Sequence, residues 1–330
     1  MIISRTPLRI SFAGGGTDLP SFYTKHDYGA VLSCSINKYI YVTVKEHSKI
    51  FKEKIRLNYS DTETVNTIDE IKNPILRECL RFLDIDDHIY ISTIADAQAS
   101  TGLGSSSTFC VGLLHALYSY KNEPVSRGKL AEEAAHIELD VLKRPMGKQD
   151  HYSAVFGGMN YIRFNDDDST SITPVSSKYE VAENIFSKMI LFWTGIVRNS
   201  EDILYQQDKN NDKNSVILLK MREQSLEMFN LIKNGDLGIE VLGDLIHKGW
   251  KMKSKLAPNI SNSNISEAYE AALSSGALGG KILGAGGGGF LNVIVPESRK
   301  NIVIAKMLKI GLKQFKVAPD SSGTTISSIS

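Results

Sequence analysis

The sequence predicts an α+β fold, in which strands and helices mix without the regular strand–helix alternation of a doubly wound parallel sheet. The chain has 330 residues, which is long enough for a large buried core in one big domain or two fused ones. Hydrophobic residues make up 42% and charged residues 23% of the chain, a composition typical of globular proteins that argues against disorder.

The strands of the first half are predicted from segments rich in β-branched and aromatic residues. Residues 2–12 alternate in polarity and form one strand, although Pro7 argues against a long central strand there. Residues 30–46 suit one or two strands, and residues 88–94 and 159–164 suit one each.

The helices of the first half are predicted from apolar residues at helical spacing. This spacing indicates helices over 67–83, 109–120 and 126–142. A polar loop over 143–150 then leads into a helical turn at 151–156.

The second half shows the same mixture of elements. Strands are predicted at 188–194, 290–295 and 313–317. Helices are predicted within 200–234 and over 236–253, 266–274 and 298–311. The tail, 320–330, is rich in Ser and Thr, and we expect it to be mobile.

Charge and cysteine content exclude several classes of function. With 38 basic and 37 acidic residues the net charge is +1, so no global field attracts nucleic acid or an anionic membrane. No apolar run reaches the ~18 residues of a membrane span, and residues 1–10 lack the apolar core of a signal peptide. Cys34, Cys79 and Cys110 form no CxxC pair, which argues against a disulfide framework or a cysteine zinc site. We expect a cytoplasmic protein with neither a nucleic-acid nor a membrane partner.

Three glycine-rich segments are the candidate sites of chemistry: AGGGTD at 13–18, TGLGSSS at 101–107 and GAGGGG at 284–289. Glycine lets the backbone approach an anion closely. The middle segment is the strongest, because its serines stand where a helix begins and the free N–H groups of a helix start attract phosphate. These serines could cap the helix, donate to phosphate oxygens or bind Mg²⁺.

Two common nucleotide and metal motifs are absent or out of context. The chain has no GxxxxGK[ST] sequence. A GxGxxG match at Gly284, Gly286 and Gly289 precedes a predicted strand instead of a helix, which argues against a dinucleotide site. The HxE of His136 and Glu138 lacks the PCxxC that a zinc deaminase needs.

Taken in order, the three segments resemble the motifs of the GHMP kinases, a family that includes galactokinase, homoserine kinase and mevalonate kinase. The matching stretches are PLRISFAGGGTD at 7–18, ASTGLGSSS at 99–107 and KILGAGGGGF at 281–290. Ala99 replaces the usual proline of the second motif and Ser107 the usual alanine. The resemblance spans essentially the whole chain.

The resemblance implies a two-lobed fold with the active site between the lobes. The N-terminal lobe would resemble the second domain of ribosomal protein S5 and occupy 1–175. The C-terminal lobe would be an α/β sandwich over 176–330. It also implies ATP and Mg²⁺ as cofactors. Neither composition nor motifs decide between a monomer and a homodimer.

The same resemblance assigns the nucleotide and metal site. It implies that the second motif cradles the ATP phosphates through Gly102, Leu103, Gly104, Ser105, Ser106 and Ser107. It places a Mg²⁺ ligand at Ser106, and Glu138 lies where the family has its metal-binding carboxylate. For each residue a structural role, as a helix cap or a solvated face, is the alternative.

Catalytic roles follow for Asp150 and Arg9. The resemblance puts the family's catalytic aspartate at Asp150, which would either accept the proton of the sugar hydroxyl or orient that hydroxyl. Arg9 matches the basic residue of the first motif, and a guanidinium there would keep Asp150 ionised. An anomeric hydroxyl is more acidic than an ordinary alcohol, so a weak base would suffice for it.

Sugar-binding residues come from the first and third motifs. Asp18 matches the family's substrate-binding aspartate, and we expect Gly15, Gly16 and Thr17 to contact the sugar with it. Gly286 and Gly287 are expected to do so from the third motif. The candidate receptors for a substrate phosphate are Lys148, Arg163, Arg198 and Lys281.

Within the family, AGGGTD, the GKQD loop at 147–150 and WTG followed by Arg198 are most similar to kinases of D-glycero-D-manno-heptose 7-phosphate. Such an enzyme phosphorylates the C1 hydroxyl to the 1,7-bisphosphate, in GDP-heptose synthesis for surface polysaccharide. L-fucokinases share part of the pattern and are the nearest alternative. A ligand sensor without catalysis is a third hypothesis, which an intact Ser106, Glu138 and Asp150 disfavour.

Overall fold

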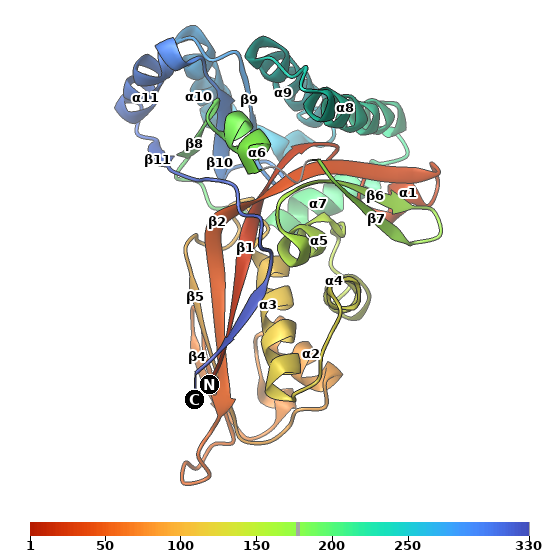
Figure 1. Ribbon diagram of the computed structural model, residues 1–330, viewed down its shortest axis with the longest axis vertical. Coiled ribbons are helices and arrows are strands. Elements are labelled where there is room, and N and C mark those ends of the chain that lie inside the picture. The colour runs from red at the N-terminus through yellow and green to blue at the C-terminus, as the bar shows by residue number, and fades with distance from the viewer. Residues whose placement is uncertain (176–178, 330) are drawn as a thin grey trace.

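The computed structural model describes residues 1–175 and 179–329 as strands and helices arranged around two sheets (Figure 1). The strands are β1 Ile2–Ala13, β2 Tyr28–Glu46, β3 Ile55–Asn58, β4 Thr62–Val65, β5 Ile89–Ala95, β6 Met159–Asn165, β7 Thr170–Pro174, β8 Met189–Trp193, β9 Gly279–Ile282, β10 Phe290–Ile294, β11 Lys313–Phe315 and β12 Thr325–Ser328. The helices are α1 Pro20–Tyr23, α2 Pro74–Phe82, α3 Ser105–Tyr120, α4 Arg127–His136, α5 Gln149–Phe156, α6 Tyr179–Phe186, α7 Ser200–Lys209, α8 Ser215–Asn234, α9 Ile239–Lys253, α10 Ser263–Ser274 and α11 Lys300–Lys309.

The larger sheet is organised by β2, a single strand of 19 residues. Its first half pairs with β6 and its second half with β5, while β1 runs antiparallel beside most of its length. The full order is β12-β1-β2-β5-β3-β4, with β7 added outside β6. The register of β1 against β2 shifts between Pro7 and Arg9, at the start of the first motif, 7–18.

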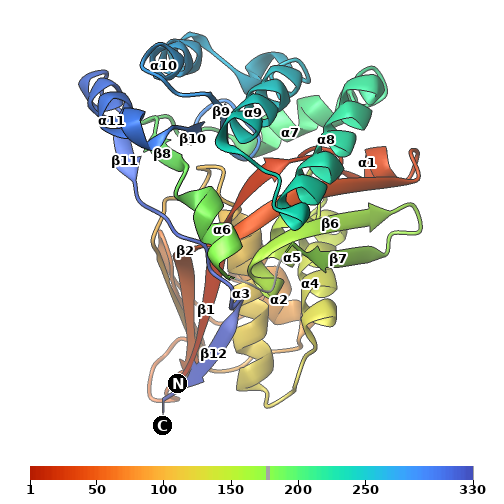
Figure 2. The same ribbon diagram turned by 45° about the horizontal axis from the view of Figure 1, so that its top comes forward.

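The smaller sheet has the order β11-β8-β10-β9 and is antiparallel throughout. α9 packs against β9, and α10 packs against α11. α3 covers β1 and β2 in the first half, and α8 from the second half also packs on β2 (Figure 2). One apolar cluster therefore runs from β1 and β2 into α8, α9 and β10, and the two halves share part of their core.

The chain ends by returning to the first sheet. β12 pairs antiparallel with β1, with Ile2 opposite Ser328, so residues 325–328 are ordered and the predicted mobile tail is wrong there. The Ser and Thr side chains suit an edge strand, and β1 has a free edge to pair. β12 thus belongs to the first sheet, although it lies in the predicted second domain. The proposed boundary between 175 and 176 adjoins 176–178, which lie outside the described residues.

Several elements differ from the sequence predictions at their ends. The helix predicted over 67–83 begins only at Pro74, because Pro74 fits the first helical position and the Asn73 side chain caps the N–H groups of Ile75 and Leu76. The helix predicted over 126–142 ends at His136 and continues as a π-helical turn. The short elements β3, β4, β7, β9 and α6 were not predicted.

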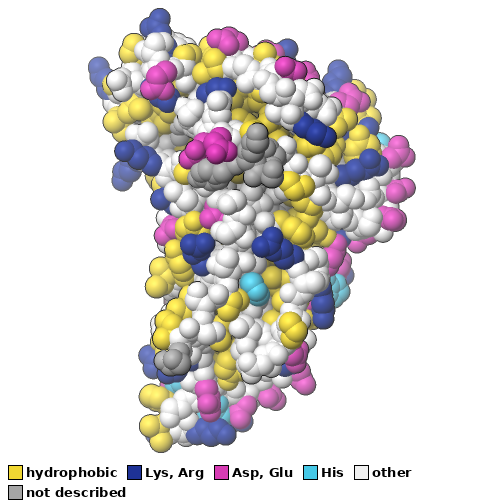
Figure 3. Space-filling model, viewed as in Figure 1, with side chains coloured by type: hydrophobic (Ala, Val, Ile, Leu, Met, Phe, Trp, Pro, Cys, Tyr) yellow, Lys and Arg dark blue, Asp and Glu magenta, His cyan; other side chains and the backbone are white. Residues whose placement is uncertain are grey.

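Three features of the structure bear on the predictions from composition: the surface charges, the length of its apolar helices and the state of its cysteines. Basic and acidic side chains are interspersed on the face shown in Figure 3. Over the described ranges, no helix is both long and apolar enough to cross a membrane. Cys34, Cys79 and Cys110 are all buried free thiols.

Candidate active site

A cavity of about 840 Å³ opens between the first sheet and the loops of the second half. Its size lies in the usual range of small-molecule sites. The cavity is lined by glycines of all three motifs, namely Gly15, Gly16, Gly102, Gly104 and Gly284. The fold thus brings together segments that lie far apart in the sequence.

The second glycine segment ends directly at the start of a long helix. Gly104 is the N-cap of α3, with φ 80, and α3 runs for 16 residues from Ser105. No side chain caps this helix start, so the serines do not act as ordinary caps. The first N–H groups of α3 are left to a ligand, and this end of the helix attracts anions.

The second and third glycine segments touch each other. A Cβ placed on Gly284 would lie 2.4 Å from Cα of Gly102, and one on Gly102 would lie 2.4 Å from the carbonyl oxygen of Leu283. Both positions have positive φ, at 67° and 89°. Only glycine allows this approach, so the loop before α3 is held against the second half of the chain.

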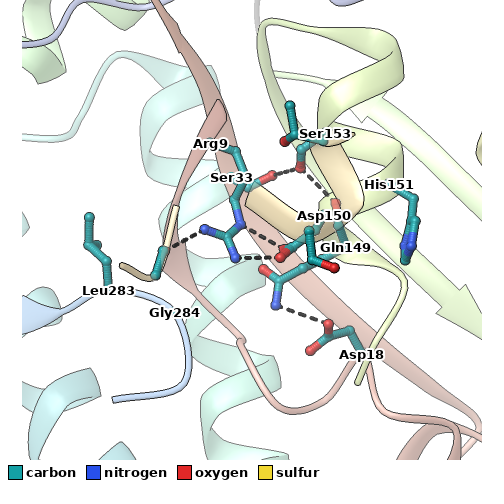
Figure 4. A network of polar contacts seen from close by, with 12 residues as sticks. Arg9, Asp18, Ser33, Gln149, Asp150, His151, Ser153, Leu283 and Gly284 are labelled. Carbon is teal, nitrogen blue, oxygen red and sulfur yellow. Dashed lines mark hydrogen bonds and ion pairs between the residues drawn. The ribbon is translucent and has the colours of Figure 1, made fainter. Parts of the chain in front are cut away.

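Arg9 and Asp150 form the central ion pair of the cavity (Figure 4). Nε of Arg9 donates to Oδ1 of Asp150 and Nη2 donates to Oδ2, each at 2.7 Å, in a bidentate pair. Nη1 of Arg9 donates to the carbonyl oxygen of Gly102 at 2.7 Å, and the N–H of Arg9 donates to the carbonyl of Leu103 at 3.0 Å. Arg9 therefore joins the loop of the second motif, residues 101–107 (the phosphate loop), to the Asp150 carboxylate.

The Asp150 carboxylate faces the phosphate loop directly. Asp150 lies in the first turn of α5, and a Cβ on Gly104 would lie 3.2 Å from its Oδ2. Its side chain is 14% exposed, whereas that of Arg9 is 4% exposed. The carboxylate is thus locked by a buried cation yet open to the cavity.

A second polar cluster lies behind the serines of the loop. Ser106 Oγ donates to Oε1 of Glu138, and Nε2 of His151 donates to Oε2 at 2.8 Å. Glu138 is fully buried on the π-helical turn after α4. Burial disfavours its ionised form, but the interactions with His151 and Arg144 outweigh burial and lower the pKa of Glu138 to about 2.

The oxygens of Ser106 and Glu138 fit a divalent cation. Nη1 of Arg144 lies 2.5 Å from Ser106 Oγ and 2.6 Å from Glu138 Oε1, so a cationic group already occupies the point between them. A hydroxyl and a carboxylate are the hard oxygen donors that Mg²⁺ prefers. Among the residues described, no group of three or more His, Cys, Asp or Glu could hold a metal, which suits an ion bound mainly by phosphates and water.

Asp18 is a second carboxylate that lines the cavity. It accepts hydrogen bonds from the N–H of Gly16 at 2.8 Å and from Nε2 of Gln149 at 2.9 Å. Burial and the nearby charge of Asp150 raise its pKa, although these hydrogen bonds partly oppose the rise. Gln149 and Asp150 are consecutive, so one turn of α5 fixes both Asp18 and the Arg9 pair.

Comparison with known proteins decides the family. The profile of the GHMP kinase N-terminal domain matches residues 67–158, and that of the C-terminal domain matches 232–313. The D-glycero-alpha-D-manno-heptose 7-phosphate kinase of Campylobacter jejuni is 30% identical over 93% of both chains. The chain belongs to the GHMP kinase family.

More distant relatives agree with this assignment. The L-fucokinase/L-fucose-1-P guanylyltransferase of Bacteroides fragilis is 25% identical over 93% of this chain but only 36% of its own. The crystal structure of a D-glycero-D-manno-heptose 1-phosphate kinase from Bacteroides thetaiotaomicron is 24% identical and covers all of both chains with a TM-score of 0.81. The predicted two-lobed α+β GHMP kinase fold is confirmed.

The GHMP kinase motifs place most of the predicted residues around the cavity. The predicted site residues that line it are Arg9, Gly15, Gly16, Asp18, Gly102, Gly104, Ser105, Ser106, Asp150 and Arg198. Glu138 lies directly behind Ser106. The side chains of Leu103 and Ser107 are fully buried, and their predicted contact with phosphate, through backbone N–H groups, stays a prediction.

Three predicted sugar contacts, Thr17, Gly286 and Gly287, and the phosphate receptor candidate Lys148 do not line the cavity, contrary to expectation. Thr17 is buried, and its hydroxyl donates to the carbonyls of Gly14 and Ala30. Lys148 pairs with Asp168 at 2.9 Å. Gly286 packs against Ile260, and Gly287 packs against Ile203 and Asn259.

Two further cations considered for a substrate phosphate have structural roles. Arg163 stacks over the ring of Tyr28 at 4.0 Å. The buried Lys281 donates to the carbonyl oxygens of Ser11 and Phe12 at 2.8 and 3.1 Å. Of the four candidates, only Arg198 lines the cavity.

Polar residues of the site without a predicted role include Arg144, Gln149, His151 and Lys253. Arg144 lies in the polar loop 143–150, where nothing in the sequence distinguishes it, and Gln149 belongs to the GKQD segment but had no role of its own in the prediction. Lys253 carried a usable signal, because it continues the face of Ile246 and Trp250 at helical spacing. A lysine on the apolar face of a helix is unusual, and in this case it lines the cavity.

Proposed function

We propose that the protein is an ATP- and Mg²⁺-dependent kinase that phosphorylates the C1 hydroxyl of D-glycero-D-manno-heptose 7-phosphate to give the 1,7-bisphosphate. The product would feed GDP-heptose synthesis for surface polysaccharide. The observation that carries the kinase chemistry is the Arg9–Asp150 pair beside the start of α3. The choice of sugar is supported by the Campylobacter jejuni relative, at 30% identity over 93% of both chains.

The geometry supplies what phosphoryl transfer requires, which is positioning and charge stabilisation. The N-terminal N–H groups of α3 would bind the nucleotide phosphates, because that helix start has no side-chain cap. Asp18 would accept hydrogen bonds from sugar hydroxyls with the lone pairs that Gly16 and Gln149 leave free. The acceptor would then lie between Asp18 and the loop.

Asp150 is placed to handle the proton of the attacking hydroxyl. Each of its oxygens accepts one bond from Arg9 and keeps a lone pair that can accept another. As the sugar oxygen forms its bond to the γ-phosphorus of ATP, the bond from that phosphorus to the bridging oxygen would break, ADP would leave, and the proton of the hydroxyl would pass to Asp150. Arg9 holds the carboxylate in one orientation, so its direction is set before the sugar binds.

Ser106 and Glu138 would hold the divalent cation at the edge of the loop. When bound, this ion supplies positive charge that neutralises the nucleotide phosphates. The low pKa of Glu138 keeps its carboxylate ionised at neutral pH, as a metal ligand must be. Arg144 would leave these oxygens as the ion binds.

The proposed function is tested by measuring ADP release with ATP, Mg²⁺ and a panel of sugars and sugar phosphates. We expect turnover with D-glycero-D-manno-heptose 7-phosphate and at least about tenfold lower kcat/KM with unphosphorylated sugars. Turnover with L-fucose and none with the heptose phosphate would favour the second candidate, for which the Bacteroides fragilis relative is the observation. Nucleotide binding without turnover on any acceptor would favour a ligand sensor.

A further inference from the structure

Beside the Arg9–Asp150 pair, two cations line the cavity without a carboxylate partner. We propose that Lys253 and Arg198 form a receptor for a phosphate group at the transfer centre. This inference rests on the proposed function, because it assumes that phosphorylated ligands enter this cavity. The ligand class is a phosphate monoester or terminal phosphoryl group, supplied either by ATP or by the sugar phosphate.

Lys253 is the last residue of α9 and is 7% exposed. Its Nζ donates to the carbonyl oxygen of Gly284, in the loop that packs against Gly102. An ammonium group has three donors, and this bond uses one. Two donors remain at a point where Lys253 lines the cavity.

Arg198 follows the turn after β8 and contacts the residue before Gly284 in the same loop. Its Nη1 donates to the carbonyl of Ser100 at 3.0 Å and its Nη2 to the carbonyl of Leu283 at 3.3 Å. Its buried Nε has no hydrogen-bond partner. Neutral carbonyl oxygens thus hold the guanidinium beside the phosphate loop. Among the described residues, no carboxylate compensates its charge.

The charges around this pair favour an anion. Within the described part of the chain, neither Lys253 nor Arg198 forms an ion pair with a carboxylate. Burial and the charges of Arg198 and Arg9 lower the pKa of Lys253 to about 8, while Asp18 and Asp150 act in the opposite direction. A buried cation held among other cations costs stability, and a bound dianion would remove that cost.

The position of the pair leaves two sources for the phosphate. Contacts with Gly284 and Ser100 place it next to the loop that would bind the nucleotide. Lys253 also lines the same cavity as Asp18 and Asp150, where the acceptor would bind. The terminal phosphoryl of ATP and the phosphate of the sugar both match two adjacent cations with free donors.

The experiment compares wild type with Lys253→Met and with Lys255→Met, an exposed lysine just beyond the end of α9. Binding of ATP, ADP, inorganic phosphate and D-glycero-D-manno-heptose 7-phosphate is measured by titration calorimetry. Thermal unfolding is followed in parallel. Methionine keeps the length and apolar stem of the lysine, so the variant removes the charge with little change in packing.

If ATP supplies the phosphate, Lys253→Met weakens ATP binding by about tenfold or more and leaves ADP unchanged. If the sugar supplies it, binding of the heptose phosphate weakens by the same factor and both nucleotides are unaffected. In either case inorganic phosphate binds more weakly, the unfolding temperature stays equal or rises, and Lys255→Met behaves as wild type.

The proposal is overturned if every affinity of Lys253→Met stays within about twofold of wild type. It is also overturned if all ligands weaken equally while the unfolding temperature falls, since Lys253 would then only anchor Gly284. Absence of turnover with any sugar would contradict the proposed function alone. The ATP, ADP and inorganic phosphate titrations would still decide whether the receptor exists.

Discussion

Two pairs of residues line the candidate site and differ in how their charges are compensated. Arg9 is matched by Asp150 through two bonds of 2.7 Å and is buried behind it. Among the residues that the structure describes, Lys253 and Arg198 have only carbonyl oxygens as partners. A matched charge fixes a neighbour in place, whereas an unmatched buried charge is costly until a ligand binds. The first pair is therefore built to orient and the second to bind.

The largest effect on activity is expected at Asp150, the carboxylate of the Arg9–Asp150 pair. In Asp150→Asn the side chain can still accept hydrogen bonds but carries no charge and is a far weaker base. We expect kcat to fall by two or more orders of magnitude, at roughly the scale of groups that act in the transition state. Steady-state ADP release measures this, with the exposed Asp166→Asn as control. A loss of less than about tenfold would remove Asp150 from the role of base.

The two pairs are expected to contribute differently to the free energy of unfolding. Arg9→Met leaves the Asp150 carboxylate without its buried partner, and we expect the free energy of unfolding to fall by about 3 kcal/mol. Lys253→Met removes a cation that has no such partner, so no comparable loss is expected. Urea unfolding measures both, with the exposed Lys255→Met as a surface control. Equal losses in the two variants would show that the pairs do not differ as described.

Arg144 offers a test of the proposed site for the divalent cation. Its Nη1 contacts the two oxygens that would bind the divalent cation. Arg144→Gln removes this competitor, so Mn²⁺ should bind the nucleotide-free protein about tenfold more tightly. Electron paramagnetic resonance of free Mn²⁺ gives the affinity, and Ser106→Ala should weaken it. Unchanged Mn²⁺ affinity in Arg144→Gln would mean that the ion binds at another place.

The smallest expected effect concerns pH. Lys253 is protonated below its pKa of about 8, so the receptor loses one positive charge as the pH rises through that value. Binding of inorganic phosphate should weaken about threefold or more between pH 7 and 9, after allowance for the titration of phosphate itself. Lys253→Arg keeps its charge over this range and should show a flat profile. A wild-type profile as flat as that of Lys253→Arg would contradict the assignment.

The sequence indicates the motif residues of the site more directly than the directions of its long cationic side chains. Arg9, Asp18 and Asp150 belong to motifs whose backbone is fixed by glycines and by a helix start, so their positions follow from local structure. Lys148 belongs to the same loop as Asp150, but its side chain turns to Asp168. The direction of a long side chain depends on partners that lie far away in the sequence, and no motif encodes it.

The fold shows the same division between local and distant determinants. Strands β1 and β5 and helices α3 and α9 were predicted from local sequence: β5 and α9 bury one face, and β1 and α3 are apolar and buried along most of their length. β12 was not predicted, because its Ser- and Thr-rich sequence becomes a strand only through the free edge of β1. Gly286 and Gly287 were expected to contact the sugar but pack against other residues, because a run of glycines does not reveal which of them faces a ligand.

The pairing of β12 with β1 has a consequence for biosynthesis. The hydroxyls of Thr6 and Thr324 meet across 318 positions, so a strand made at the beginning waits for one made near the end. Until then the outer edge of β1, the strand that carries Arg9, is bare while the ribosome is still adding residues. Such a long-range closure is slow, and the nascent chain offers a β-edge that chaperones can shield and other nascent chains can capture.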